Sequence, residues 1–238
     1  MIAIFKRDFI GYFTSAIGYV YLGSYILVLN LMFYLGNMLG SSSTLVALFG
    51  FMLTIMMFIT PILTMRVFSE EFKLKTDQAL YTLPVKLTSV VLGKFLSSMA
   101  VFGCLLVLTL LWPLTISILG ENNISEVVGN YVGILCIGAA YISIGVFISS
   151  LTENQVIAAV GSLGVFIALY ILDMVAMFFF SGGVLPVWVM RILVFVSIYG
   201  RYTEITQGLL ALDTIIFFLS VCAVFLFLTV RRLEKRKL

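Results

Sequence analysis

Residues 66–94 read RVFSEEFKLKTDQALYTLPVKLTSVVLGK and separate two long apolar stretches of the chain. The segment is the only long polar interval of the sequence, and it holds five of the fourteen lysines and arginines. A charged, helix-forming segment between two membrane spans is a position at which a soluble partner can act on a membrane protein. The segment therefore predicts a connection between two spans that faces such a partner.

The composition of the chain predicts an integral membrane protein. Of the 238 residues, 62% are hydrophobic and only 11% are charged, whereas soluble domains carry about 25% charged residues. There is no extended polar region for an ATPase, protease or kinase domain, so energy must come from a gradient or a separate subunit. Cys104, Cys136 and Cys222 lie in apolar runs without metal-ligand spacing, and histidine is absent. We expect no cofactor and no metal on this chain.

The apolar runs predict an all-α fold with six transmembrane helices in one domain, residues 1–238. A span needs about 20 residues, and the expected spans are 17–38, 44–65, 95–119, 129–150, 156–180 and 214–230. Residues 1–15 predict an amphipathic helix lying at the membrane surface, although a frayed leader to the first span is the alternative. Residues 181–213 are too polar for a span and too apolar for a free loop, which predicts outer re-entrant helices.

The placement of lysine and arginine predicts the orientation. Basic residues gather in the N-terminal segment, in 66–94 and in the C-terminal tail RRLEKRK, while the connection between the third and fourth spans carries only Glu121 and Glu126. Cytoplasmic loops are enriched in Lys and Arg. Both termini and residues 66–94 are therefore expected in the cytoplasm, which agrees with an even number of spans.

Local signals at the start of the polar segment predict the beginning of a helix. Glu70 and Glu71 are expected to continue the second span into water. Thr76 is placed to cap a new helix, because its hydroxyl can accept a free backbone N–H. Asp77 then lies in the first turn, where the helix dipole favours an anion.

The second half of the segment predicts where this helix ends. Leu80 and Leu83 belong to a short apolar stripe, Pro84 stops the helix, and Thr88 or Ser89 is expected to cap the next one. Such a short amphipathic helix can dock into a groove of a cytosolic protein. A solvated hairpin whose charges only fix topology is the alternative, and these features alone leave both open.

Five stretches of the chain resemble the permeases of ABC-2 type transporters. Residues 63–71 (LTMRVFSEE), 76–85 (TDQALYTLPV) and 90–95 (VVLGKF) follow the cytoplasmic signature of that family without a gap. Residues 148–159 (ISSLTENQVIAA) and 201–213 (RYTEITQGLLALD) are similar to its loop between spans 4 and 5 and to its outer element. The most similar subgroup is that of the gliding-motility-associated permeases. Lys75 stands where a glycine is frequent and Gln78 where a glutamate is common, which puts a charge pair from that position in doubt.

The resemblance implies a non-catalytic membrane subunit of an ATP-driven exporter in the bacterial cytoplasmic membrane. Two permeases, identical or different, would sit on two ABC ATPase subunits that bind ATP and Mg. Residues 76–83 would form the coupling helix, and residues 152–155 a second contact. The residues implied at this ATPase contact are Glu70, Glu71, Thr76, Asp77, Gln78, Leu80, Tyr81, Leu83, Pro84, Glu153, Asn154 and Gln155.

Polar residues inside or beside the outer halves of the spans are candidates for a transport pathway or an outer gate. Asp173 lies deep in the fifth span, where an ionisable group is costly; it either lines a pathway or braces the outer helices against Arg191 or Arg201. Asn30 either bridges helices by a hydrogen bond or faces the pathway. The candidate residues are Asn30, Asp173, Arg201 and Glu204.

Small residues and prolines in the spans predict packing features. Gly11, Gly18, Gly36 and the pair Gly161 and Gly164 are expected to permit close approach of helices. Pro61 and Pro113 are expected to kink their helices.

Two other functions compete with an ABC permease. An autonomous channel or gradient-driven carrier would need no cytosolic helix and would show internal repeats, which are not evident in the sequence. A membrane anchor or scaffold of an ATPase-driven secretion or motility complex would use the same helix without transporting anything. A nucleic-acid partner is not expected.

Overall fold

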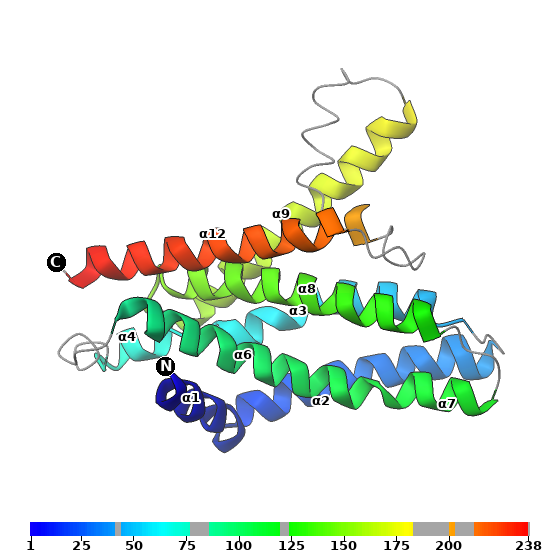
Figure 1. The fold of residues 1–238 in the computed structure, drawn as a ribbon, viewed down its shortest axis with the longest axis horizontal. Coiled ribbons are helices and arrows are strands. Elements are labelled where there is room, and N and C mark those ends of the chain that lie inside the picture. The colour runs from blue at the N-terminus through cyan, green and yellow to red at the C-terminus, as the bar shows by residue number, and fades with distance from the viewer. Residues whose placement is uncertain (41–43, 77–85, 120–123, 183–199, 203–211, 238) are drawn as a thin grey trace.

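The computed structural model describes residues 1–40, 44–76, 86–119, 124–182, 200–202 and 212–237, and Figure 1 shows their arrangement. The helices are α1 (Ile2–Thr14), α2 (Ala16–Phe33) with the π-helical η1 (Tyr34–Leu39), α3 (Val46–Thr64), α4 (Ser69–Lys73), α6 (Leu87–Thr109), α7 (Leu111–Leu119), α8 (Ile124–Ser149), α9 (Gln155–Gly182) and α12 (Leu212–Lys237). Within these residues, six helical stretches are long and apolar enough to cross a membrane. The predicted all-helical, six-span fold is confirmed.

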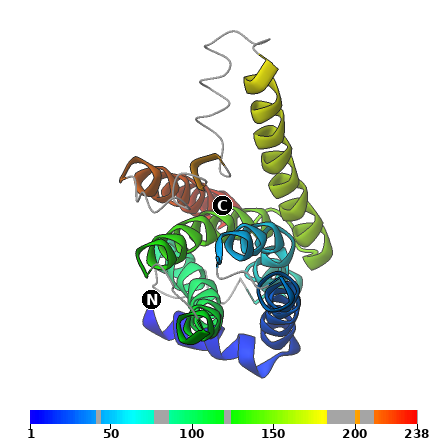
Figure 2. The ribbon, with the colours of Figure 1, turned by 90° about the vertical axis from the view of Figure 1, so that its right-hand side faces the viewer.

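Helices α3 and α8 form the centre of the bundle. Twelve of the nineteen residues of α3 are buried, from Leu48 to Thr64, as expected for a helix that is apolar on all sides. Helix α2 packs on α3, while α6 and α12 pack on α8. Helix α9 contacts α3 and α8 at its start, and its far half diverges from the other rods in both ribbon views (Figures 1 and 2).

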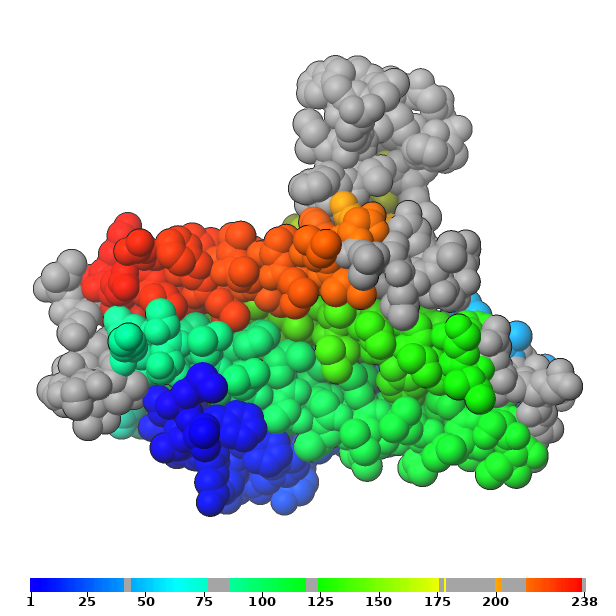
Figure 3. All heavy atoms as spheres, viewed as in Figure 1, coloured from blue at the N-terminus to red at the C-terminus, as the bar shows by residue number. Residues whose placement is uncertain are grey.

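Helix α1 crosses the bundle instead of running along it. Figure 2 shows α1 lying across the lower face, and Figure 3 shows it on the surface beside α6. The extended backbone of Ser15, with φ −110° and ψ 160°, turns the chain from α1 into α2. A Cβ on Gly18 would lie 2.4 Å from the Tyr12 carbonyl oxygen, so the corner requires glycine here. The helix predicted over residues 1–15 is confirmed, as is the close approach at Gly18.

The two prolines have different effects on their helices. The third span is divided at Leu110 into α6 and α7, because Pro113 has no N–H to donate to the carbonyl of Thr109. Pro61 lies inside α3, which continues to Thr64.

Several expected boundaries and contacts differ from the structure. Helix α6 begins at Leu87, with Lys86 at its N-cap and no side-chain cap, so the capping predicted for Thr88 or Ser89 is wrong. A Cβ added to Gly11, Gly36 or Gly164 would meet no atom within 4 Å, so these three glycines do not serve close packing among the described residues. The predicted helix at 77–83 and most of 181–213 lie outside the described residues.

Candidate functional site

The junction between α3 and α4 is a tight turn held by one serine of α8. The Ser149 hydroxyl accepts hydrogen bonds from the backbone N–H groups of Phe68 (3.1 Å) and Ser69 (3.2 Å) and donates one to the Met65 carbonyl (3.0 Å). These three bonds use the hydrogen and both lone pairs of the hydroxyl. They fix the turn against α8, so two of the quoted sequence stretches, 63–71 and 148–159, meet here.

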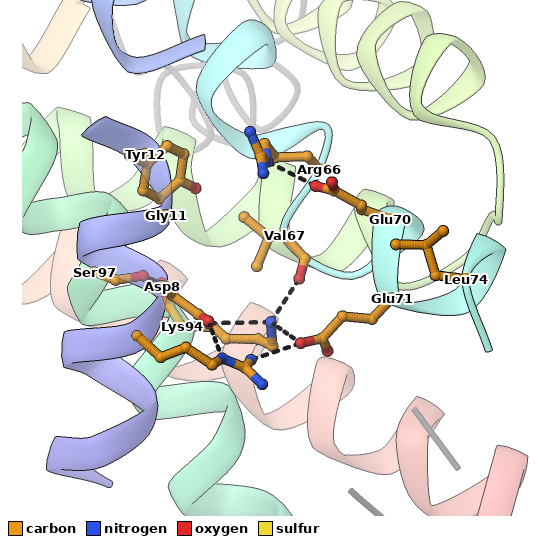
Figure 4. Close-up of a pocket in the computed structure, with 11 residues that line it drawn as sticks. Asp8, Gly11, Tyr12, Arg66, Val67, Glu70, Glu71, Leu74, Lys94 and Ser97 are labelled. Atoms are coloured by element: carbon orange, nitrogen blue, oxygen red, sulfur yellow. Dashed lines mark hydrogen bonds and ion pairs between the residues drawn. The ribbon is translucent and has the colours of Figure 1, made fainter. Parts of the chain in front are cut away.

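A group of six charged side chains, here called the ionic cluster, lies at the end of the bundle next to this turn (Figure 4). Its centre is Lys94 of α6, which is only 3% exposed. The Lys94 Nζ lies 3.1 Å from Asp8 Oδ2, 3.0 Å from Glu71 Oε1 and 2.9 Å from the Val67 carbonyl. Three acceptors match the three protons of an ammonium group, and a buried charge needs such partners. The members of the cluster are Arg7, Asp8, Arg66, Glu70, Glu71 and Lys94.

Two arginines extend the cluster. Arg7 donates from Nε to Asp8 Oδ1 at 2.8 Å and from Nη2 to Glu71 Oε1 at 2.6 Å. Burial lowers the pKa of Arg7, but the neighbouring Asp8 and Glu71 outweigh this and raise the pKa overall. Arg66 pairs through Nε with Glu70 at 2.7 Å and donates from Nη1 to the Ser15 hydroxyl, also at 2.7 Å. The cluster therefore joins α1, α4 and α6.

A cavity of about 240 Å³ adjoins the cluster. It is lined by all six charged residues together with Gly11, Tyr12, Val67, Leu74 and Ser97. The Tyr12 hydroxyl donates to the Leu63 carbonyl and lies 3.0 Å from Ser98 Oγ. Burial raises the pKa of Tyr12 to about 12, although its hydrogen bond with Ser98 acts in the opposite direction. Among the described residues Glu71 Oε2 is buried and has no hydrogen-bond partner.

The surroundings of Glu70 and Glu71 differ from the prediction. Both were expected to continue the second span into water, but the turn at residues 65–68 redirects the chain. The side chain of Glu71 is 15% exposed and faces Lys94 and Arg7, while Glu70 pairs with Arg66. Their contact with an ATPase remains a prediction.

Thr76 closes α4, whereas the helix that it is predicted to cap lies in residues 77–83, outside the described residues. Its backbone N–H donates to the Glu71 carbonyl, and the N–H of Lys75 donates to the Phe72 carbonyl. Lys75 has a φ of 56°. This pair of bonds around a left-handed residue is a Schellman motif. The other predicted members of the coupling helix lie outside the described residues: Asp77, Gln78, Leu80, Tyr81, Leu83 and Pro84.

The predicted second contact, residues 152–155, lies at the same end of the bundle. Asn154 caps α9, because its Oδ1 accepts the Val156 N–H at 2.9 Å, and Gln155 is the first residue of that helix. Glu153 is exposed and pairs with Arg236 of α12 at 2.5 Å. The Arg236 guanidinium also lies 3.9 Å from the centre of the Phe72 ring in α4. The loop is thus next to α4 and the C-terminal end of α12.

The candidate pathway residues within the spans have mixed surroundings. The Trp112 Nε1 of α7 donates to Asn30 Oδ1 of α2 at 2.8 Å, so the helix-bridging role expected for Asn30 is confirmed. Asp173 is 9% exposed within α9. A role of either residue in a pathway remains a prediction.

Residues 200–202 are the described part of the outer element. The Arg201 guanidinium lies 4.3 Å from the centre of the Phe217 ring in α12. The Tyr202 hydroxyl donates to Asn130 Oδ1 of α8 at 2.8 Å, and Tyr202 is 1% exposed. This buried hydrogen bond attaches the element to the bundle. Glu204 lies outside the described residues.

The sequence reasoning missed the central residues of the cluster. In the sequence Lys94 counts only as one of the basic residues of 66–94 that indicate topology, and no pattern points to Arg7, Asp8 or Ser149 as site residues. A usable signal for Lys94 was its position within the apolar run from Val90 to Phe102, where an isolated lysine must find acidic partners if it is buried.

The six long apolar helices among the described residues define a multi-pass membrane protein. The family profile described as ABC-2 family transporter protein matches residues 47–238, which is most of the chain. The chain therefore belongs to the ABC-2 transporter family, whose members are the permease components of ABC transporters and work with an ABC ATPase. Helices α1 and α2 precede the matched region. No curated protein matches the chain.

Proposed function

We propose that this protein is the permease subunit of an ATP-driven exporter and that residues 76–85 dock on its ATPase. Two permeases, either identical or paired with a homologue, would stand on two ATPase subunits, which bind ATP and Mg. The complex would lie in a bacterial cytoplasmic membrane with both termini of this chain in the cytoplasm. The exporter direction rests on the resemblance of the cytoplasmic signature to this family.

The observation that supports coupling at this place is the ion pair between Glu71 and Lys94, at 3.0 Å. These residues belong to α4 and α6, the helices on either side of residues 77–85. Asp8 and Arg7 connect the same pair to α1. A displacement of the connecting segment would therefore move the ends of the second and third spans and α1 together.

Residues 152–155 would provide the second ATPase contact. Glu153 is 62% exposed, so a partner can reach it. Its pairing with Arg236 would also carry a movement of this loop to α12. The end of α4, which residues 77–85 follow in the chain, and the start of α9 lie at one end of the bundle, near both chain termini (Figure 1), which suits a single cytosolic partner.

The test is co-purification of the ATPase with the double variant Leu80→Asp and Leu83→Asp. A carboxylate pressed into an apolar groove costs several kcal/mol, so we expect binding to weaken about 100-fold or more. The matched control is Thr88→Asp with Ser89→Asp, which adds the same two charges in the first turn of α6, where a helix dipole favours anions. The control should retain the ATPase.

Other outcomes separate the competing functions. If the leucine variant keeps the ATPase and its stimulation, the docking assignment is wrong. If the ATPase binds and hydrolyses ATP but no substrate moves in reconstituted vesicles, the protein is a scaffold. If no ATPase co-purifies even with the unaltered chain, the result favours an autonomous channel or carrier over a permease subunit.

A further inference from the structure

An exposed amide side chain lies deep within the first span. Helix α2 and η1 together form Ala16–Leu39, one of the six long apolar stretches of the described residues. At about 1.5 Å per residue, Asn30 lies more than about 10 Å from either end of this stretch, and hence inside the hydrocarbon of a bilayer. Asn30 is exposed, whereas Asn37 and Asn130, the other asparagines of the described spans, are buried. Part of a polar side chain is therefore exposed at a depth where lipid offers it no hydrogen bond.

Trp112 fixes which half of this amide is in use. The Trp112 Nε1 donates to Asn30 Oδ1 at 2.8 Å, and an indole nitrogen can only donate, so it must face the amide oxygen. Asn30 Nδ2 donates to no group among the described residues, although the Nδ2 atoms of Asn37 and Asn130 both donate to backbone carbonyls. An N–H group without an acceptor is costly in hydrocarbon. A second molecule packed against this face of α2 can supply the acceptor.

The exposed residues around Asn30 have the spacing of a helix-packing seam. Val20, Leu27 and Tyr34 are each more than half exposed, and a Cβ on the exposed Gly23 would meet no atom within 4 Å. Together with Asn30 they recur at alternating steps of three and four residues, which is the pattern along which two helices pack side by side. We call these five residues the α2 seam. A single asparagine in such a seam sets the register and the number of the packed helices.

We propose that the α2 seam packs against the same seam of a second copy of this chain, and that the two Asn30 side chains hydrogen-bond across the two-fold axis. The inference rests on the proposed pairing of two permeases and identifies the second permease as an identical chain. Two copies with the same orientation in the membrane bring Asn30 to the same depth, so the residue meets its own counterpart. Each Nδ2 donates to the Oδ1 of the other copy, because this oxygen has a second lone pair beside the one that accepts from Trp112.

The exposed face of α12 does not need a protein partner of this kind. Its exposed side chains near the middle of the span are apolar, as Leu219, Val224 and Phe227 show. The exposed Ser220 is satisfied within its own helix, because its hydroxyl donates to the Phe217 carbonyl at 2.7 Å. Lipid acyl chains suit such a face, so α12 provides the control positions for a test of the α2 seam.

The first experiment is disulfide cross-linking of the purified full chain in lipid vesicles, without ATPase. The native cysteines are replaced by alanine, and a single cysteine is introduced by Leu27→Cys, next to Asn30 in the α2 seam. Oxidation with copper phenanthroline should yield a covalent dimer, because identical positions along a two-fold seam come close together. Val224→Cys is the control, since Val224 is also more than half exposed and lies near the middle of α12. Its dimer yield should be at least fivefold lower.

The second experiment measures the dissociation constant of the dimer by energy transfer between copies labelled at Lys235→Cys, as added lipid dilutes them in vesicles. Asn30→Leu should raise this constant at least threefold, because it removes the hydrogen bonds across the axis. Asn30→Gln keeps a donor and an acceptor and should change the constant less than twofold. Trp112→Phe removes only the hydrogen bond within one copy, so its effect should also stay below twofold. A role of Asn30 limited to holding Trp112 would instead give equal effects for Asn30→Leu and Trp112→Phe.

Three results would overturn the proposal. One is an equal dimer yield for Leu27→Cys and Val224→Cys, and another is an effect of Asn30→Leu that is below threefold or equal to that of Trp112→Phe. The third is rapid reaction of Leu27→Cys with a water-soluble maleimide without a cross-link, which would place the α2 seam on an aqueous pathway. Loss of ATPase binding in the Leu80 and Leu83 variant has no bearing on these results, because no ATPase is present. The failure of the coupling proposal and the failure of this one are therefore distinguishable.

Discussion

Lys75 occupies a backbone conformation that ordinarily selects glycine. Its φ of 56° closes the Schellman motif at the end of α4, and side chains with a Cβ pay about 1–2 kcal/mol in this region. The resemblance to the ABC-2 permeases places a frequent glycine at the same position. The chain therefore has lysine in place of the frequent glycine at the one position, among the described residues other than glycine, whose φ is positive.

Replacing Lys75 by glycine is expected to stabilise the protein by about 0.5–1 kcal/mol. The relief of strain is partly offset by the greater freedom of glycine in the unfolded chain. Thermal unfolding in detergent measures the effect. Lys73→Gly, in the last turn of the same helix, should instead destabilise by about 1 kcal/mol; equal signs for the two variants would contradict the left-handed conformation.

Gly145 permits a close contact between the two central helices. A Cβ built on Gly145 of α8 would lie 2.3 Å from Thr64 Oγ1 and 2.7 Å from Thr64 Cβ in α3. Thr64 is fully buried and its hydroxyl donates to the Thr60 carbonyl. The threonine therefore has little room to move aside.

We expect Gly145→Ala to destabilise the protein by about 1–3 kcal/mol, as overpacking does. Gly164→Ala is the matched control, because a Cβ there meets no atom within 4 Å; it should be neutral or slightly stabilising. The measurement is the unfolding temperature of both variants in one detergent. An equal shift for the two variants would rule out the contact with Thr64.

At the scale of elements, the ionic cluster attaches α1 to the bundle end together with the Tyr12 hydrogen bonds and apolar packing. Lys94 of α6 contacts both Asp8 of α1 and Glu71 of α4. The Ile4 Cβ lies 3.3 Å from the place of a Cβ on Gly93, which is close to the Cβ separation of a disulfide. The yield of a disulfide between cysteines placed at Ile4 and Gly93 therefore measures whether α1 is packed against α6.

Lys94→Met is expected to loosen α1 and to lower the yield of the Ile4→Cys and Gly93→Cys disulfide several-fold. Removing the ammonium leaves Asp8 and Glu71 with only Arg7 as a cation, and breaking a buried pair is costly. The three native cysteines are first replaced by alanine. Lys86→Met, an exposed lysine at the start of the same helix, should leave the yield unchanged; a full yield in Lys94→Met would show that apolar packing alone seats α1.

At the scale of the whole molecule, the termini and α4 share one end of the bundle (Figure 1). The basic residues of the sequence predict that this end lies in the cytoplasm. In a cysteine-free background, Asn122→Cys should react with a membrane-impermeant maleimide in intact cells. Lys235→Cys should react only after the membrane is permeabilised, and the reverse pattern would invert the topology and remove the basis for an ATPase at residues 76–85.

The sequence predicted the six spans well because each is a local run of apolar residues. Its misses concern interactions between residues far apart in the chain. Asp8, Glu71 and Lys94 come from three different segments, and no periodicity connects them. Whether a glycine contacts a neighbour also depends on packing, so the sequence predicts a contact at Gly164, which a Cβ shows to be open, and does not predict the one at Gly145. Residues of the expected coupling helix beyond Thr76 lie outside the described structure, so that part of the candidate site remains a prediction.

Helix α6 runs without interruption for 23 residues, which corresponds to a straight rod of about 34 Å. Because such a rod does not fold in its middle, a swing of about 5° about its centre would shift each tip by about 1.5 Å. One tip adjoins Lys86, and the other is the joint with α7 at Leu110, two residues from the indole that holds Asn30 at 2.8 Å. A displacement of that size is enough to break this hydrogen bond. A movement at the Lys86 end of α6 would therefore release Asn30 from Trp112 at the opposite end of the helix.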